Sequence, residues 1–159
     1  MTNTATGIRS ARVGDADRLR AIFGDAVRAV GPQHYRPEQV AMWASFSDDE
    51  SAWTALWPST AMWVAEDATK VVGFVCLAPA QHVHLLYVDP CAHRQGVAMA
   101  LLTHAESWAR ENNITMLTTN ASLISHPLFL EAGYRVDAWE ESERNGVCFR
   151  RARMSKALP

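Results

Sequence analysis

The amino-acid sequence predicts a single mixed α/β domain, in which a central and mostly antiparallel sheet is flanked by helices on both faces. Two patterns support this prediction: helical periodicity up to residue 57 is followed by strand-type runs from residue 61, and strands alternate with helices in the second half. A chain of 159 residues is long enough to bury one core, so we expect one domain over residues 1–159.

The first third of the chain is predicted to hold one strand and three helices. Apolar and polar residues alternate over 8–13, as in a strand, and apolar residues then recur at helical spacing over 14–30. Pro37 suits the first turn of a second helix. Ser47 and Glu50, three residues apart, predict a capping box for a short third helix. We therefore expect a helical layer before the sheet is completed.

The rest of the chain is predicted to complete the sheet. Three strand-type runs follow one another across short turns and predict an antiparallel meander, over 62–66, 71–77 and 82–88. A helix, a strand, a short helix and two strands are then predicted, over 97–112, 114–119, 125–133, 135–140 and 147–154. Ser125 is expected to cap the short helix, and Asn145-Gly146 is typical of a two-residue hairpin turn.

Composition and charge exclude several classes of protein. The formal net charge is -2 and the pI is near 6.3, so the chain lacks the positive field that nucleic acid binding requires. No stretch of about 18 apolar residues occurs, which argues against a membrane protein. Cys76, Cys91 and Cys148 are odd in number and widely spaced, which favours reduced thiols. We therefore expect a cytoplasmic protein that binds neither nucleic acid nor membrane.

The stretch from Leu85 to Ala98 carries the clearest functional signal, because a strand leads there through a short loop into a long helix. The first N–H groups of a helix have no internal partner and lie at the positive end of its dipole, so they bind phosphate where no side chain intrudes. Gly96 and Ala98 keep this approach open. The stretch has neither the Gly-Lys-Ser/Thr of a P-loop nor a GxGxxG fingerprint, so these two nucleotide sites are excluded.

The positions from His93 to Ala98 resemble the cofactor loop of the GNAT acetyltransferase superfamily, whose pattern is Arg/Gln-x-x-Gly-x-Gly/Ala after a strand ending in an apolar-x-Pro sequence. His93 departs from the usual Arg or Gln. The later stretch from Ser125 to Tyr134 is similar to the family's Ala-x-x-Phe-Tyr-x-x-x-Gly-Phe segment. The chain is thus identified as a member of this superfamily. The phrase from Glu38 to Ala44 is similar to a bacterial branch of acetyltransferases with undefined substrate.

The resemblance implies a GNAT-like acyl-CoA acyltransferase fold and an N-acetyltransferase activity. Acetyl-CoA, the cosubstrate, would give its acetyl group to a primary amine of a small molecule or peptide by direct attack in a ternary complex. Backbone groups of the preceding strand would bind the pantetheine and acyl carbonyl, and the loop would hold the pyrophosphate. The residues implied in cofactor binding are Leu86, Tyr87, Val88, His93, Arg94, Gln95, Gly96, Val97, Ala98, Ser122 and Phe129.

Such a reaction requires a base for the amine proton and support for the leaving thiolate. His84 is the first candidate for the base, because by alternation it shares a strand face with Leu86 and His82, and because histidine titrates near neutral pH; the alternative is an ordinary hydrogen-bonded or solvated histidine. The family's usual acid is a tyrosine, but the matching residue is Phe129. Ser122, Tyr35 and water remain as donors, although a thiol pKa of about 8.5 makes an obligatory acid unnecessary.

Two functions of other classes stay open. The first is a non-catalytic acyl-CoA-binding or sensing domain, which the missing tyrosine favours, and the second is an interaction module that has kept only the fold. His82-x-His84 with Cys91 and His93 lacks the fixed spacing of a zinc site, so no metal is expected. Most tryptophans are predicted in the core, with Trp43 a candidate for lining an acceptor pocket. The acceptor amine and the oligomeric state stay open, a homodimer included.

Overall fold

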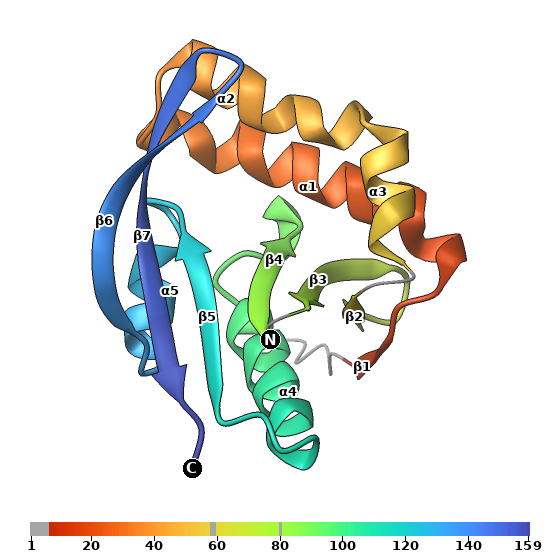
Figure 1. Cartoon of the computed structure of the whole chain (residues 1–159). Coiled ribbons are helices and arrows are strands. Elements are labelled where there is room, and N and C mark those ends of the chain that lie inside the picture. Colours follow the sequence, from red (N-terminus) through yellow and green to blue (C-terminus); the bar gives the residue numbers. More distant parts are fainter. Residues whose placement is uncertain (1–6, 58–59, 80) are drawn as a thin grey trace.

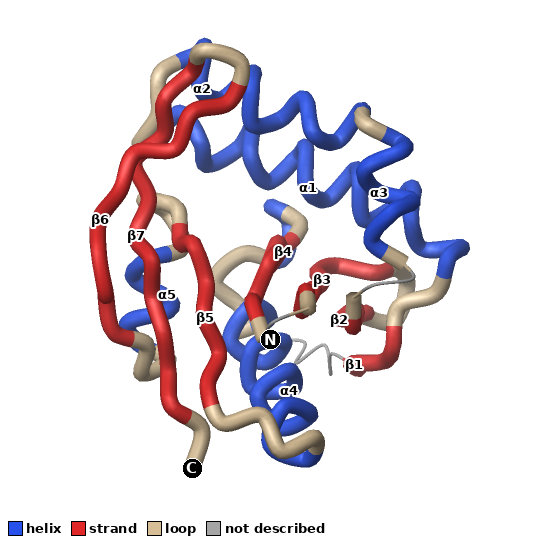
Figure 2. Tube along the Cα trace, viewed as in Figure 1, coloured by secondary structure: helices blue, strands red, loops and turns tan. Residues whose placement is uncertain are grey.

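The computed structural model describes residues 7–57, 60–79 and 81–159. In these residues seven strands form one sheet in the order β1-β2-β3-β4-β5-β7-β6 (Figures 1 and 2). The strands are β1 Gly7–Ser10, β2 Ala61–Glu66, β3 Val71–Ala78, β4 His82–Val88, β5 Met116–Ala121, β6 Arg135–Arg144 and β7 Val147–Ala157. β4 and β5 are parallel and every other neighbouring pair is antiparallel, as a mostly antiparallel mixed sheet requires.

Helices cover both faces of this sheet. They are α1 Ala16–Val30, α2 Pro37–Ala44, α3 Glu50–Leu56, α4 Val97–Glu111 and α5 His126–Glu131. Figure 1 shows α1, α2 and α3 on one side of the sheet, with α4 and α5 on the other. The fold class predicted from the sequence, a mixed sheet with helices on both faces, is confirmed.

Each face of the sheet has its own apolar core. Leu19, Ile22 and Phe23 of α1 are buried on one side, and Leu101 and Leu102 of α4 on the other. β3 is buried from its first residue to its seventh, because a central strand covered on both faces has no polar side. The two cores fix how α1 and α4 are oriented across the strands between them.

Most predicted elements are confirmed, and the differences have local causes. β1 ends at Ser10, before residue 13, because the Asp15 carboxylate accepts the Arg12 N–H (2.7 Å) and draws the chain into a 3-10 turn. The last two strands are longer than predicted, and the turn between them is confirmed by positive φ at Asn145 and Gly146, 49° and 81°.

The predicted cap at Ser47 is wrong. Its buried hydroxyl donates to the Ala44 carbonyl (2.8 Å), whereas Asp49 is the N-cap of α3 and accepts an N–H of the first turn (3.1 Å). A carboxylate at that position also interacts favourably with the helix dipole. Ser125 lies at the N-cap of α5 as predicted, but its hydroxyl accepts the Ser122 N–H (3.0 Å) and does not cap the helix.

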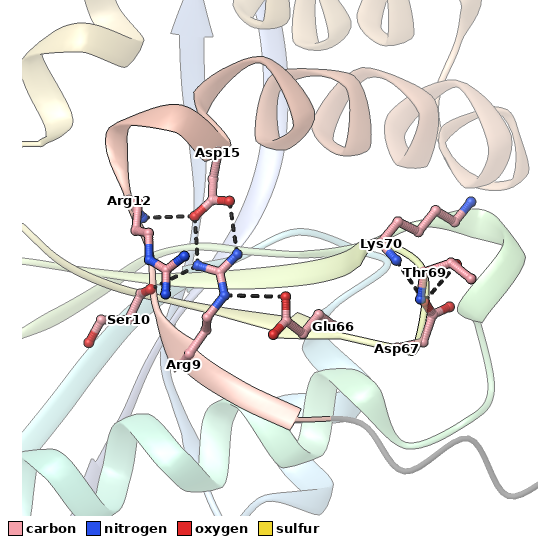
Figure 3. A network of polar contacts seen from close by, with 8 residues as sticks. All are labelled: Arg9, Ser10, Arg12, Asp15, Glu66, Asp67, Thr69 and Lys70. Atoms are coloured by element: carbon pink, nitrogen blue, oxygen red, sulfur yellow. Dashed lines mark hydrogen bonds and ion pairs between the residues drawn. The ribbon is translucent and has the colours of Figure 1, made fainter.

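Arg9 joins three elements near the start of the chain (Figure 3). Its guanidinium donates twice to Asp15, at the start of α1 (2.9 and 3.0 Å), and once to Glu66, at the end of β2 (3.2 Å). These hydrogen bonds to Arg9 hold the pKa of the Asp15 carboxyl below its usual value. In the next turn Asp67 accepts two backbone N–H groups (2.8 and 2.9 Å). The edge of the sheet is thus fastened to α1.

None of the helices within the described ranges is long and apolar enough to cross a membrane.

Candidate active site

The sheet opens between β4 and β5. Within the described residues, these parallel strands pair only at His82 with Thr118 and Val83 with Thr119. The Thr119 hydroxyl then donates to the Val83 carbonyl (2.9 Å), which is the acceptor that a longer ladder would use. Beyond this point the two strands separate (Figure 1). Residues 84–88 of β4 therefore present one edge to an opening in the sheet.

A β-bulge at His84 accompanies this separation. Cys76 of β3 pairs with Leu85 and the next residue, Leu77, pairs with Val83, so His84 has no counterpart in the register. One extra residue reverses the alternation of the strand. Leu85 consequently packs with the core of α1, whereas Leu86 packs with the core of α4. The predicted shared face of His84 and Leu86 is wrong for this reason.

The backbone of β4 divides its groups between β3 and the opening. The Asp89 N–H donates to Val72 of β3 (2.8 Å), so ladder alternation points the backbone of Tyr87 toward β3 and that of Leu86 and Val88 toward the opening. The Val88 carbonyl contacts Nε2 of His93 (2.9 Å). The Leu86 N–H and C=O and the Val88 N–H thus face the opening without a ladder partner in the described sheet.

The loop before α4 forms the far end of the opening. Arg94 and Gly96 have positive φ, 62° and 78°, and Gly96 is the N-cap of α4 in the left-handed region. The described first turn of α4 contains no acidic residue, and no side chain caps it. A Cβ added at Gly96 would meet nothing within 4 Å. The first N–H groups of α4 therefore have no capping side chain in the described residues, and an anion site there stays a prediction.

Asp89 holds this loop to the rest of the fold. It is buried, pairs with Arg18 of α1, and accepts the Cys91 N–H (2.9 Å), while Arg18 also donates to the Val71 carbonyl (2.9 Å). Burial alone would raise the pKa of the Asp89 carboxyl, but the bonds from Cys91 and Arg18 outweigh it and lower the pKa to about 2. Asp89 was not among the residues predicted from the sequence.

Tyr35 and Ser122 lie together where β5 ends. The Tyr35 hydroxyl accepts the Leu123 N–H (2.9 Å), and the Tyr35 ring packs on the edge of Trp43 (5.4 Å between centroids). Burial raises the pKa of Tyr35, against the opposing effects of the Leu123 N–H and the Ser122 hydroxyl, so its phenol is protonated at neutral pH. The Ser122 hydroxyl accepts the Ser125 N–H (3.0 Å) and contacts that residue's hydroxyl (3.1 Å), which fixes it within its own turn.

Phe129 lies apart from these groups. It is 2% exposed, belongs to the core under α4, and packs edge-on against Tyr134 (5.0 Å between centroids). The Tyr134 hydroxyl is itself buried, with no hydrogen-bond partner in the described chain. Phe129 therefore contributes apolar packing to this core and no proton.

The two histidines of β4 lie on the face toward α1 and α2. His82 contacts the Thr118 hydroxyl through Nδ1 (2.8 Å), whereas His84 is exposed. Partial loss of hydration lowers the pKa of His84 below its usual 6.5, and the positive charge of Arg144 lowers it further. Burial, then His84 and Arg151, lower the pKa of His82. Both imidazoles are therefore neutral at pH 7, and His84 can accept a proton.

Metal-ligating side chains do not gather in the described ranges: no group of three His, Cys, Asp or Glu residues there could hold an ion. The three cysteines are free thiols, with Cys76 buried and Cys91 and Cys148 exposed.

Comparison with known proteins agrees with this geometry. The family described as "Acetyltransferase (GNAT) domain" matches residues 32–158. A protein of Escherichia coli K12 described as "Uncharacterized N-acetyltransferase YafP" is 34% identical over 142 residues, 89% of each chain. This chain therefore belongs to the GNAT family of acetyltransferases, and it is an acyltransferase enzyme.

Solved structures share the whole fold. The crystal structure of a GCN5-related N-acetyltransferase from Rhodopseudomonas palustris is 27% identical, with a TM-score of 0.93 over 99% of both chains. A PaiA N-acetyltransferase from Thermoplasma acidophilum, solved in complex with coenzyme A, is 15% identical, with a TM-score of 0.76 over 96% of this chain and 99% of that chain. The GNAT fold expected from the sequence is confirmed.

We predict that Asp89→Asn lowers the free energy of unfolding by roughly 2 kcal/mol at pH 7, because it removes a carboxylate whose pKa is depressed to about 2. A depressed pKa stabilises the fold above the unfolded value of about 4, and this contribution is lost as pH falls through about 2. About half of the difference should thus remain at pH 3. Urea unfolding of both proteins at the two pH values measures it.

Asp17→Asn is the control for this measurement, because the Asp17 side chain is 98% exposed. It should change the free energy of unfolding by less than about 0.5 kcal/mol. A loss in Asp89→Asn that is identical at pH 7 and pH 3 would show that packing, and not the charge of Asp89, carries the effect.

Proposed function

We propose that this enzyme transfers the acetyl group of acetyl-CoA to a primary amine of a small molecule or peptide, by direct attack within a ternary complex. The observation that carries the proposal is the opening between β4 and β5, which has the free edge of β4 along it and the uncapped start of α4 at its end. The coenzyme A bound to the Thermoplasma acidophilum relative supports the choice of cofactor.

The cofactor would bind along this opening. The N–H groups of the loop and of the first turn of α4, from His93 to Ala98, would hold the pyrophosphate. The Leu86 N–H and C=O would pair with the amide groups of the pantetheine arm, as an added strand does. The thioester would then lie between β4 and the end of β5, where Tyr35 and Ser122 are found.

Two groups beside the opening suit the proton transfers. Neutral His84 would take a proton from the amine as its nitrogen attacks the thioester carbon, and the C–S bond would break as the amide forms. Tyr35 would give its phenolic proton to the departing thiolate, in place of the tyrosine that Phe129 replaces. We prefer Tyr35 to Ser122, because the Ser122 hydroxyl is held within its own turn.

The experiment that tests this function is a calorimetric titration with acetyl-CoA, followed by a screen for thiol release against amines in the same buffer. Binding with turnover establishes the enzyme in solution. Binding without turnover on any amine supports the alternative, an acyl-CoA-binding or sensing protein. Absence of binding refutes the proposed site. The expected cytoplasmic compartment and the oligomeric state stay predictions that this experiment does not address.

We predict that Gly96→Glu weakens acetyl-CoA binding at least about 100-fold, because its carboxylate enters the site of the pyrophosphate. Gly96→Gln is the matched control, since both side chains bear the same backbone strain at φ 78° but only Glu is charged. Calorimetry measures both affinities, and circular dichroism verifies the fold. Equal affinities of the Glu and Gln variants would place the pyrophosphate elsewhere.

We predict that His84→Gln lowers kcat/KM about 100-fold at pH 7 and removes the acidic limb of the pH–rate profile. In the native enzyme this limb should lie below pH 6.5, because the pKa of His84 is lowered and the neutral form is the base. His82→Gln is the control and should retain the limb. A limb that survives in His84→Gln would exclude His84 as the base.

We predict that Tyr35→Phe lowers kcat 10-fold to about 100-fold with little change in the KM for acetyl-CoA, because the thiolate then leaves without a proton donor. Loss of the phenol should also remove the alkaline limb of kcat. Ser122→Ala, measured in parallel, should keep this limb. If Tyr35→Phe retains both its rate and its alkaline limb, water protonates the thiolate.

A further inference from the structure

We propose that the acceptor amine carries a carboxylate, which the arginines on the inner face of the β6–β7 hairpin bind. This inference rests on the proposed acetyl transfer and adds the chemical class of its acceptor. The inner face is the one that β5, β7 and β6 turn toward α1 and α2, on the same side as His82 and Tyr35.

Strand register shows which side chains share this face. In β7, Phe149 packs on Tyr35 (6.1 Å between ring centroids), so alternation places Arg151 and Arg153 on the same face. In β6, Arg144 pairs with Val147 and Glu140 pairs with Arg151. Because directly paired residues of neighbouring strands share a face, Arg144 and Glu140 also face inward. Arg150 faces the opposite way and stacks over Trp139 (5.0 Å), which marks the outer face.

The charges of this face do not balance. Arg135 pairs with Asp137 (3.0 Å), and Arg151 pairs with Glu140 (2.7 Å). Arg153 approaches Glu140 only at 3.7 Å, as the second cation on one carboxylate. The Arg144 side chain has no ion pair or hydrogen bond to any described residue. Four arginines therefore face two carboxylates, an excess of two positive charges on one side of the sheet.

Arg144 is the arginine of this face whose charge acts on the proposed base. The hairpin that carries it is docked on α2, where Gln39 donates to the Cys148 carbonyl (2.8 Å). The Arg144 charge reaches His84, and it opposes the burial that raises the pKa of Tyr87 to about 12. An anion bound by Arg144 would therefore place an amine a few bonds away beside His84.

The charges of the site favour a carboxylate over an anion that carries more than one charge. A planar guanidinium pairs with a carboxylate through two hydrogen bonds, whereas the nearby Glu140 would repel the second charge of a phosphate. The rings of Phe149 and Tyr35 would contact an apolar part.

The test compares acceptors that differ in this charge, with rates expressed per concentration of neutral amine, because the carboxylate also raises the pKa of the amine. We expect kcat/KM with phenylalanine to exceed that with phenylalaninamide about tenfold, with saturating acetyl-CoA and thiol release as the readout. Arg144→Gln should reduce this ratio to about one, through the KM for phenylalanine. Arg150→Gln is the matched control on the outer face and should leave the ratio unchanged. Equal rates for the two acceptors in the native enzyme, or an unchanged ratio in Arg144→Gln, would overturn the proposal.

A second titration needs neither cofactor nor turnover. N-acetylphenylalanine and its carboxamide are added to the native protein and to Arg144→Gln, and calorimetry measures the binding of each. Binding of the carboxylate but not of the carboxamide, weakened about tenfold in Arg144→Gln, supports an anion site. This result would stand even if acetyl-CoA did not bind, because failure of acetyl-CoA to bind would refute only the proposed transfer. Equal binding of both compounds, or binding of neither, overturns the anion site.

Discussion

The divergence of β4 from β5 is the constraint on which the site depends. A parallel pair that continued beyond Val83 would close the sheet and use the backbone groups that the opening needs. Two local features prevent this: the extra residue at His84 shifts the strand by one position, and the Thr119 hydroxyl takes the last carbonyl. The cost is an incomplete sheet, which the core under α4 compensates, because its apolar residues come from strands on both sides of the break.

The same break links stability to binding. α4 must begin where β4 ends, and Asp89 fixes that junction by joining Arg18 of α1 to the Cys91 N–H. Since Asp89 is buried and its pKa is low, it stays charged and keeps the loop in place over the whole physiological range of pH. The first turn of α4 can then remain uncapped, because the loop before it is held from the other side. An uncapped helix start is unfavourable by itself, because its first N–H groups lack hydrogen-bond partners, but the same N–H groups can bind an anion.

The sequence predicts those parts of the site that are local. The loop from His93 to Ala98 and its helix lie within one stretch, so spacing and glycine suffice to identify them. The contact between Tyr35 and Leu123 joins residues 88 positions apart, and no pattern in the sequence records it. The bulge at His84 was equally hidden, because strand alternation assumes one residue per position. The face on which Arg144 lies could have been predicted from the sequence, because the Asn145-Gly146 turn next to it fixes the register of the hairpin.

A positive inner face is consistent with an enzyme that must work on a neutral amine. Positive charge disfavours ammonium, so it would lower the pKa of a bound amine, just as the charge of Arg144 adds to the burial that lowers the pKa of His84. The same field would repel an amine with no other charge or with several positive charges. A carboxylate on the acceptor resolves this conflict, because it binds the arginines while the amine loses its proton. Selectivity and chemistry would then arise from one set of charges.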